Sequence, residues 1–369
     1  MNLVEILKFS EEYLKKYSFS KPRLEAEKLV SYVLNLDRIA LYIHYERELS
    51  DDEKASIKEY LKKMTEENKN FDELKGEKKD YKEENLDIFN KSVEYLKKNG
   101  VPNSLLDTEY IFSDVLKVSR NTLKYSMSRE IKEEDKNKIR EMLVLRAKKR
   151  KPLQYILGEW EFYGLPFKVS EGVLIPRADT EILVEQCIQL MRDTEEPNIL
   201  DIGTGSGAIS IAIANELKSS SVTGIDINEK ALKLANENKV LNKVENVNFM
   251  KSDLFENIEY RKFDMIISNP PYISDNEIGV MSEDTLLHEP DEALFAENNG
   301  LFFYYEICRN GMNYLQNNGY LLFEIGYRQG EVVKEIVKKA GFKNVNIIKD
   351  MQNNDRVVAG QKQMEKNEV

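Results

Sequence analysis

The sequence is poor in the residues that form disulfides and hold metals. Its 369 residues include two cysteines, Cys187 and Cys308, and two histidines, His44 and His288. Neither cysteine lies in a C-x-x-C pair or in the spacing of a zinc site, and the histidines are too few for a histidine-based centre. We therefore predict neither a disulfide framework nor a metal site.

Long apolar runs and an excess of positive charge are also missing. No apolar run approaches the roughly 18 residues of a membrane span, and the N-terminus lacks the basic and apolar regions of a signal peptide. We therefore expect a cytoplasmic protein without a membrane span. The formal net charge is −11, which argues against sequence-nonspecific binding of DNA or RNA because such binding needs clustered Lys and Arg.

One basic cluster stands against this acidic background, at residues 146–151 (RAKKRK). We expect it to be a solvated helix end, because cations are favourable at the C-terminal end of a helix dipole. Contact with ribosomal RNA or with an acidic partner is the alternative.

The first 150 residues contain an internal repeat. When the sequence is aligned with itself at an offset of 82 positions, residues 12–16 (EYLKK) fall on residues 94–98, and many apolar positions further along coincide. Apolar residues recur at helical spacing in both copies, so each copy is predicted to be a small bundle of short amphipathic helices. The predicted segments are a first helical module (1–67), a charged linker (68–85), a second helical module (86–150), a bridging hairpin and linker (151–180), an α/β domain (181–361) and a tail (362–369).

Alternating aromatic residues predict a β-hairpin after the second module. Residues 160–162 (WEF) and 167–169 (FKV) are its expected strands, and residues 163–166 (YGLP) its turn. We expect this hairpin to bridge the helical and α/β domains, with its aromatic side chains packed in a core.

From residue 181 onward, strand and helix patterns alternate. The first helix is predicted at 181–191, with Asp179 or Thr180 as its N-cap. Alternation of this kind predicts a mostly parallel, doubly wound sheet that binds ligands beyond the carboxyl ends of its strands. The predicted strands are 198–202, 222–227, 247–251, 264–268, 319–324, 345–349 and 356–359, and the further helices are 208–217, 229–241, 300–316 and 329–340.

A glycine-rich segment, residues 203–207 (GTGSG), follows the first of these strands. Glycines there let the backbone approach a ligand closely and leave helix N-terminal N–H groups free. Asp226 lies at the end of the next strand, about 20 residues on, where a carboxylate accepts hydrogen bonds from a ribose diol. The segment reads G-x-G-x-G and not the dinucleotide fingerprint G-x-G-x-x-G. It therefore predicts a ribose-bearing ligand, with a nicotinamide cofactor as an alternative.

The tetrapeptide Asn269-Pro270-Pro271-Tyr272 follows a buried strand and is the most informative feature of the chain. The Asn269 side-chain oxygen can accept one N–H of a target amide or exocyclic amine, and the Pro270 carbonyl can accept the other. Tyr272 offers an aromatic face to a flat amide or base. Such a pocket holds a weakly nucleophilic nitrogen for attack on an electrophilic methyl group. It makes S-adenosylmethionine the preferred ligand of the glycine-rich segment.

This combination resembles the HemK/PrmC family of glutamine N5-methyltransferases over roughly residues 86–360. The resemblance implies an α/β, Rossmann-like class I S-adenosylmethionine-dependent methyltransferase with a seven-stranded, mostly parallel sheet, preceded by the duplicated all-α module and the bridging hairpin. The stretches that carry it are Pro152-x-x-Tyr155-Ile156-x-Gly158, Phe162-x-Gly164, Val173-Leu174-Ile175-Pro176-Arg177-x-Asp179-Thr180-Glu181, residues 201–207, 269–272, Glu289-Pro290, Ala293-Leu294 and Asp355-Arg356-Val357-Val358.

The resemblance also implies roles for individual residues. Asp226 would bind the donor's ribose, Leu254 would lie beside its adenine, and Asn269 would face both donor and substrate. The implied donor site comprises Gly203, Thr204, Gly205, Ser206, Gly207, Asp226, Leu254 and Asn269. The implied catalytic residues are Asn269, Pro270 and Tyr272, and Pro271 completes the substrate pocket. The substrate would be the glutamine in the Gly-Gly-Gln motif of peptide chain release factors.

Other functions remain open on the sequence. Adenine-N6 methylation is the nearest enzymatic alternative, because the same tetrapeptide can hold a flipped base. It would need a basic groove, and we expect no direct, sequence-specific contact with nucleic acid. Two further alternatives are methylation of a glutamine in a ribosomal protein and a role as an adaptor without enzymatic activity. We expect the helical modules to recognise the substrate protein. The extra copy at 1–67 has no family role, and the oligomeric state stays open, with a monomer as the working expectation.

Overall fold

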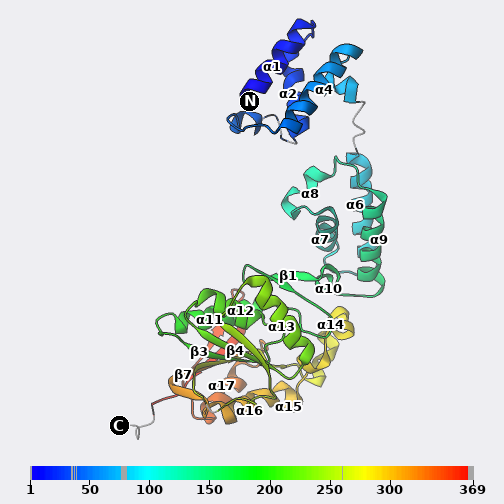
Figure 1. Ribbon diagram of the computed structural model, residues 1–369. Coiled ribbons are helices and arrows are strands. Elements are labelled where there is room, and N and C mark those ends of the chain that lie inside the picture. Colours follow the sequence, from blue (N-terminus) through cyan, green and yellow to red (C-terminus); the bar gives the residue numbers. More distant parts are fainter. Residues whose placement is uncertain are drawn as a thin grey trace. The chain divides into compact units, whose positions relative to one another are not determined.

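The computed structural model describes residues 2–364 except residues 35, 37, 39, 76–80 and 260. The chain forms two compact units, Met1–Glu84 with Ser128–Glu130 and Asn85–Met127 with Ile131–Val369. Figure 1 labels several of their helices and strands. Among the described residues, no helix has the length and apolar character that a membrane crossing requires.

The first unit is a helical bundle around one apolar core. Asn2 and Ser50 cap its first and fourth helices through capping boxes, in which a Glu side chain returns the hydrogen bond. Phe71 belongs to the segment predicted as a linker, yet its side chain is buried in this core. The folded module therefore extends past residue 67, and residues 76–80 of the predicted linker lie outside the described residues. The helices are α1 (Leu3–Lys16), α2 (Pro22–Leu34), α3 (Ala40–Ile43), α4 (Asp51–Glu67) and α5 (Phe71–Lys75).

The second helical module has internal contacts that match those of the first at the offset of 82. Arg38 Nη2 lies 2.6 Å from Glu27 Oε2, and Arg120 Nη2 lies 2.7 Å from Glu109 Oε2. Equivalent contacts are what two copies of one module would make, and the duplication itself stays a prediction. The helices of this part are α6 (Lys82–Lys98), α7 (Ser104–Leu116), α8 (Arg120–Ser126), α9 (Glu133–Lys148) and α10 (Leu153–Leu157).

The predicted hairpin forms from β1 (Glu159–Phe162) and β2 (Leu165–Lys168), which pair antiparallel. Its turn consists of Tyr163 and Gly164, both with positive φ, as a tight two-residue hairpin turn requires. The turn predicted over residues 163–166 was therefore too long, because the pairing of the two strands continues to the edge of this tight turn.

The α/β domain contains the expected seven-stranded sheet, in the order β5-β4-β3-β6-β7-β9-β8. The pairs from β5 to β7 are parallel, and β9 is antiparallel to both of its neighbours. The winding direction changes between β3 and β6, which opens a crevice at the carboxyl ends of these strands. The strands are β3 (Asn198–Ile202), β4 (Ser221–Asp226), β5 (Val247–Lys251), β6 (Phe263–Ser268), β7 (Leu315–Glu324), β8 (Lys343–Lys349) and β9 (Asp355–Gln361).

Helices follow most of the strands, as predicted from the alternating pattern. The helix predicted at 300–316 was too long, because Leu315 already pairs with Phe263 in the sheet. The helices are η1 (Ala178–Thr180), α11 (Glu181–Met191), α12 (Ala208–Glu216), α13 (Glu229–Asn242), η2 (Asp275–Val280), α14 (Glu283–His288), η3 (Asp291–Ala293), α15 (Glu297–Gly300), α16 (Phe302–Gly311) and α17 (Gly330–Lys339).

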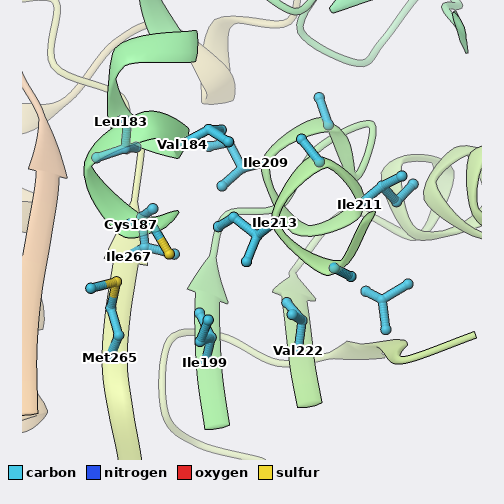
Figure 2. Packing of buried hydrophobic residues seen from close by; sticks show 14 of the residues in the cluster. Leu183, Val184, Cys187, Ile199, Ile209, Ile211, Ile213, Val222, Met265 and Ile267 are labelled. Carbon is cyan, nitrogen blue, oxygen red and sulfur yellow. The ribbon is translucent and has the colours of Figure 1, made fainter. Parts of the chain in front are cut away.

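Two apolar cores cover the two faces of this sheet. Successive residues of one strand point to opposite faces, so Ile199 belongs to one core and Leu200 to the other. Figure 2 shows α11 and α12 over the first face, with Cys187 above Met265 and Ile213 above Ile199. Helices α16 and α17 contribute to the core on the second face. The two packed faces hold the strand ends in place.

The basic cluster at residues 146–151 is only in part the predicted solvated helix end: α9 ends at Lys148, and Lys148 and Lys149 are exposed, but Arg146 is not. Arg146 is buried, and its guanidinium contacts two carboxylates, with Nε 2.6 Å from Asp107 Oδ2 and Nη1 2.7 Å from Asp284 Oδ2. Arg150 Nε lies 2.9 Å from Asp284 Oδ1. Sequence could not show the carboxylates that neutralise these cations, because they lie on α7 and α14, far away along the chain.

Candidate functional site

A cavity lies at the carboxyl ends of β3, β4 and β6. Residues that follow each of these strands line it, together with the chain before α11. The last residues of β3 and β6, Ile202 and Ser268, pair with each other, so the glycine-rich turn and the Asn-Pro-Pro-Tyr segment start side by side. The predicted site residues that line the cavity are Gly203, Thr204, Gly205, Ser206, Asp226, Leu254, Asn269, Pro270 and Pro271.

The glycine-rich turn requires backbone angles that side chains disfavour. Gly203, Gly205 and Gly207 have φ values of 74°, 56° and 80°. A Cβ at Gly203 or Gly205 would meet nothing within 4 Å, whereas a Cβ at Gly207 would lie 2.9 Å from Phe249 Cζ. Gly207 is also absent from the cavity lining. Its geometry serves close packing of α12 against β5, while the first two glycines leave bare backbone at the cavity.

Asp226 ties this turn to the end of β4. Its Oδ2 accepts a hydrogen bond from the Gly205 N–H at 2.8 Å, and its Oδ1 accepts one from the Asn228 N–H at 2.8 Å. Burial raises the pKa of Asp226, and the backbone hydrogen bonds partly offset that rise. The carboxylate therefore organises the loop in addition to lying at the cavity, where a ribose diol could donate to it.

Asp201 supports the same turn from inside the sheet. Its Oδ2 accepts hydrogen bonds from Thr204 Oγ1 and Ser210 Oγ, both at 2.7 Å. Full burial raises the pKa of Asp201 to about 6, although these two hydroxyl groups lower it. Asp201 belongs to the motif at residues 201–207, but no role for it was predicted from the sequence. Its position in β3 makes it the residue that fixes the start of α12 against the strand.

The tetrapeptide after β6 divides between the cavity and the core. Asn269, Pro270 and Pro271 line the cavity, but Tyr272 does not. The Tyr272 ring packs against the second core, and burial raises its pKa well above the ordinary value. Its carbonyl oxygen accepts a hydrogen bond from Gln329 Nε2 at 3.0 Å. The structure thus does not bring Tyr272 to the cavity wall, where the sequence placed it.

Leu254 follows β5, whose carboxyl end also reaches the cavity. It adopts a positive φ of 45°, and its carbonyl accepts a hydrogen bond from Ser252 Oγ at 2.8 Å. Ser252 and Asp253, which were not predicted as site residues, also line the cavity. Their position directly after a parallel strand is the sequence signal that could have identified them.

The segment before α11 contributes residues whose role the sequence left undecided. Arg177 lines the cavity, and its Nη2 donates to Oε1 of Glu289, which is buried. Thr180 is the N-cap residue of α11, but its side chain makes no capping hydrogen bond. Its Oγ1 instead accepts a hydrogen bond from Asn269 Nδ2 at 3.2 Å. The predicted side-chain cap at Thr180 was wrong, because the hydroxyl accepts from Asn269 and does not bond to the backbone of α11.

Two neighbouring acidic residues make local contacts. Asp179 Oδ2 lies 3.2 Å from Arg356 Nη2, and Glu181 Oε1 accepts a hydrogen bond from the Tyr163 N–H at 2.8 Å. Asp179 thus forms an ion pair with Arg356, and Glu181 binds the turn of the hairpin to the start of α11. Neither residue caps the helix through its side chain.

The lining fits S-adenosylmethionine. Bare backbone at Gly203 and Gly205 leaves room for a ligand chain, Asp226 can accept from a ribose diol, and Leu254 provides an apolar surface for a flat base. Among the described residues, no group of three or more His, Cys, Asp or Glu side chains is arranged to hold a metal ion. The cavity thus offers a nucleoside site next to the Asn-Pro-Pro segment.

Known families match both parts of the chain. The family described as "Methyltransferase small domain" matches residues 178–304, and the family described as "PrmC N-terminal domain" matches residues 5–67 and 87–158. The second match covers segments of both helical modules.

Proteins similar to this chain include release factor glutamine methyltransferases. A release factor glutamine methyltransferase of Fusobacterium nucleatum is 74% identical over 90% of this chain and 94% of its own length. One from Thermodesulfovibrio yellowstonii is 40% identical over 70% of this chain and 93% of its own. A solved release factor-specific protein-(glutamine-N5) methyltransferase from Alicyclobacillus acidocaldarius aligns with 54% of this chain and 100% of its own, at 25% identity and a TM-score of 0.34. On the sequence matches, the chain belongs to the HemK/PrmC family of release factor glutamine methyltransferases, and its methyl donor is S-adenosyl-L-methionine.

Proposed function

We propose that this protein transfers a methyl group from S-adenosyl-L-methionine to the side-chain N5 of the glutamine in the Gly-Gly-Gln motif of peptide chain release factors. The observation that carries the proposal is the single cavity that Asn269 and Pro270 share with the glycine-rich turn and Asp226. The high identity to a release factor glutamine methyltransferase supports the choice of substrate.

The donor site consists of residues at the carboxyl ends of β3, β4 and β5. Bound S-adenosylmethionine supplies an electrophilic methyl group on a sulfonium. We assign Gly203, Gly205 and Asp226 to its chain and ribose, and Leu254 to its adenine. Thr204 and Ser206 complete the turn. Gly207 acts through packing.

Asn269 and Pro270 orient the acceptor. The Asn269 Oδ1 and the Pro270 carbonyl accept the two N5 hydrogens, which aims the nitrogen lone pair at the methyl carbon. A C–N bond forms while the S–C bond breaks, S-adenosylhomocysteine leaves, and the methylated nitrogen loses one proton to water. Positioning supplies most of the catalysis because the nitrogen is a weak nucleophile. Pro271 shapes the pocket, and Tyr272 holds the segment from the core side.

The second helical module, predicted at 86–150, supplies the recognition surface for the release factor, because one glutamine side chain offers too little contact for specificity. The protein acts in the cytoplasm, as a monomer, and without sequence-specific contact to nucleic acid.

The test is transfer of a labelled methyl group to purified release factors with the motif intact or changed to Gly-Gly-Ala. We expect label only on the intact motif. Parallel reactions contain ribosomal protein or adenine-containing DNA. Label that survives the Gly-Gly-Ala change, or that enters ribosomal protein or DNA in preference to the release factor, contradicts the proposed substrate.

A further inference from the structure

Asn269 and Glu324 lie at the carboxyl ends of the neighbouring strands β6 and β7: Asn269 directly follows β6, and Glu324 is the last residue of β7. Ser268 of β6 pairs with Phe323 of β7, so the next residues, Asn269 and Glu324, lie side by side at the carboxyl ends of the strands. The Tyr304 hydroxyl donates to the Glu324 carbonyl at 3.0 Å and holds the backbone there. A carboxylate is thus built in beside the residue that faces the acceptor.

Thr180 lies between these two side chains. Its Oγ1 accepts a hydrogen bond from Asn269 Nδ2 at 3.2 Å, and its hydroxyl lies near the Glu324 carboxyl, whose pKa it lowers. A hydroxyl has one hydrogen, and an ionised carboxylate only accepts. If Thr180 donates this hydrogen to Glu324, only its lone pairs remain for Asn269. The Asn269 amide has to turn its NH₂ toward Thr180, which leaves its oxygen for the acceptor.

Glu324 is placed to enforce this order. It is 2% exposed, and its Oε2 has no hydrogen-bond partner among the described residues. Burial raises its pKa to about 7, while Thr180 and Arg356 lower it. The charged and titratable groups that act on it or are affected by it are Arg177 and Asp179 before α11, Tyr272 after β6, Tyr304 of α16, and Arg356 of β9, which is paired with Asp350.

We propose, building on the proposed function, that Thr180 and Glu324 are positioning residues. Ionised Glu324 accepts a hydrogen bond from the Thr180 hydroxyl, and Thr180 thereby fixes the Asn269 amide with its oxygen toward the acceptor glutamine. Neither residue exchanges atoms with the substrate. They determine whether the oxygen or the NH₂ group of the Asn269 side chain faces the acceptor glutamine.

Protonation of Glu324 removes this constraint. A neutral carboxyl can donate to Thr180, and the Thr180 hydrogen can then point to the Asn269 oxygen. The amide turns over, and its NH₂ faces the NH₂ of the acceptor, so donor meets donor. Methyl transfer then slows although the cavity still binds S-adenosylmethionine.

The first experiment compares Thr180→Val with Thr180→Ser in the full-length protein. Valine keeps the shape but removes the hydroxyl, so kcat with a release factor falls about 10- to 100-fold, as expected for a misplaced catalytic group. The dissociation constant of S-adenosylhomocysteine stays nearly unchanged. Serine keeps the hydroxyl and restores most of kcat. A valine variant with near-normal kcat, or one that loses donor binding as strongly as kcat, overturns the proposal.

The second experiment covers the case in which Thr180→Val fails to fold. For the unaltered protein, kcat falls as the pH drops through a midpoint at or below about 7, since the donor's positive sulfonium favours ionised Glu324. Glu324→Gln has a low kcat that is the same at every pH, close to the unaltered protein at its acidic limit. A flat profile for the unaltered protein, or an unchanged acidic limb in Glu324→Gln, overturns the proposal. No labelling of the release factor by the unaltered protein would instead refute the proposed function.

Discussion

The Arg146 guanidinium joins α9 of the second helical module to Asp284 at the start of α14, with Nη1 2.7 Å from Asp284 Oδ2. The same guanidinium pairs with Asp107, and the side chains of Arg146 and Asp107 are each 7% exposed. At the offset of 82, the first module has Met64 in place of Arg146 and Glu25 in place of Asp107. There Glu25 Oε2 accepts from the Phe71 N–H at 2.7 Å. The buried arginine thus couples the second module to the α/β domain, and the first module has a methionine at the matching position.

Replacing Arg146 with methionine should destabilise the second unit strongly. Asp107 would remain buried without its cation, and loss of one partner of a buried ion pair costs about 3–5 kcal/mol. Urea unfolding of the full chain measures the change. Arg140→Met on the same helix is the control, because that side chain is 65% exposed and its ion pair with Glu133 spans 4.0 Å. Its effect should stay below about 1 kcal/mol. Equal losses for the two variants would show that the Arg146 network adds little.

Asn269→Ala should lower kcat by about 100-fold or more, because one of the two acceptors that hold the N5 group disappears. Donor affinity should change little, since Asp226 and the glycine-rich turn remain. Single-turnover methyl transfer and calorimetric titration with S-adenosylhomocysteine measure the two quantities. Asn236→Ala is a matched control, because Asn236 donates to Leu232 within α13. Comparable losses in kcat and in donor affinity would contradict the role of Asn269.

Asp226→Asn should weaken donor binding. The new NH₂ group would face the Gly205 and Asn228 N–H donors or the ribose hydroxyls, so hydrogen bonds to a charged acceptor are lost at about 1.5–3 kcal/mol. This corresponds to about a 10- to 100-fold rise in the dissociation constant of S-adenosylhomocysteine. Glu229→Gln is the control, because Glu229 starts the next helix and pairs only with Lys251 among the described residues. The same affinity in both variants would remove Asp226 from the donor site.

Glu324→Gln should stabilise the fold at alkaline pH while it lowers activity. Burial raises the Glu324 pKa from 4.5 to about 7, so the folded state binds this proton more tightly than the unfolded state. The unaltered protein therefore loses stability as the pH rises from 4.5 to 7, relative to the glutamine variant. The difference should reach at most about 3 kcal/mol above pH 7. Urea unfolding across this range measures it, and a difference that does not grow with pH would refute the buried, destabilising carboxylate.

Local patterns in the sequence predicted most of the fold. The helix at Glu181–Met191 and the strand at Asn198–Ile202 occur with the predicted bounds. Both depend on apolar periodicity and on nearby residues. The glycine-rich turn was also predictable, because its positive φ values restrict the residue type. Errors arose where distant residues decided the outcome, as at Leu315, which the pairing with Phe263 draws into the sheet.

By itself, the sequence determined the α/β architecture, the donor loop and the Asn-Pro-Pro-Tyr segment, because these follow from periodicity, glycine and proline geometry and short motifs. Only the tertiary structure decided that Arg146 is a buried link, that Tyr272 packs in the core, and that Thr180 hydrogen bonds to Asn269. The reason is physical: hydrogen bonds and burial depend on groups brought together by folding, and Thr180 and Asn269 are 89 positions apart in the chain.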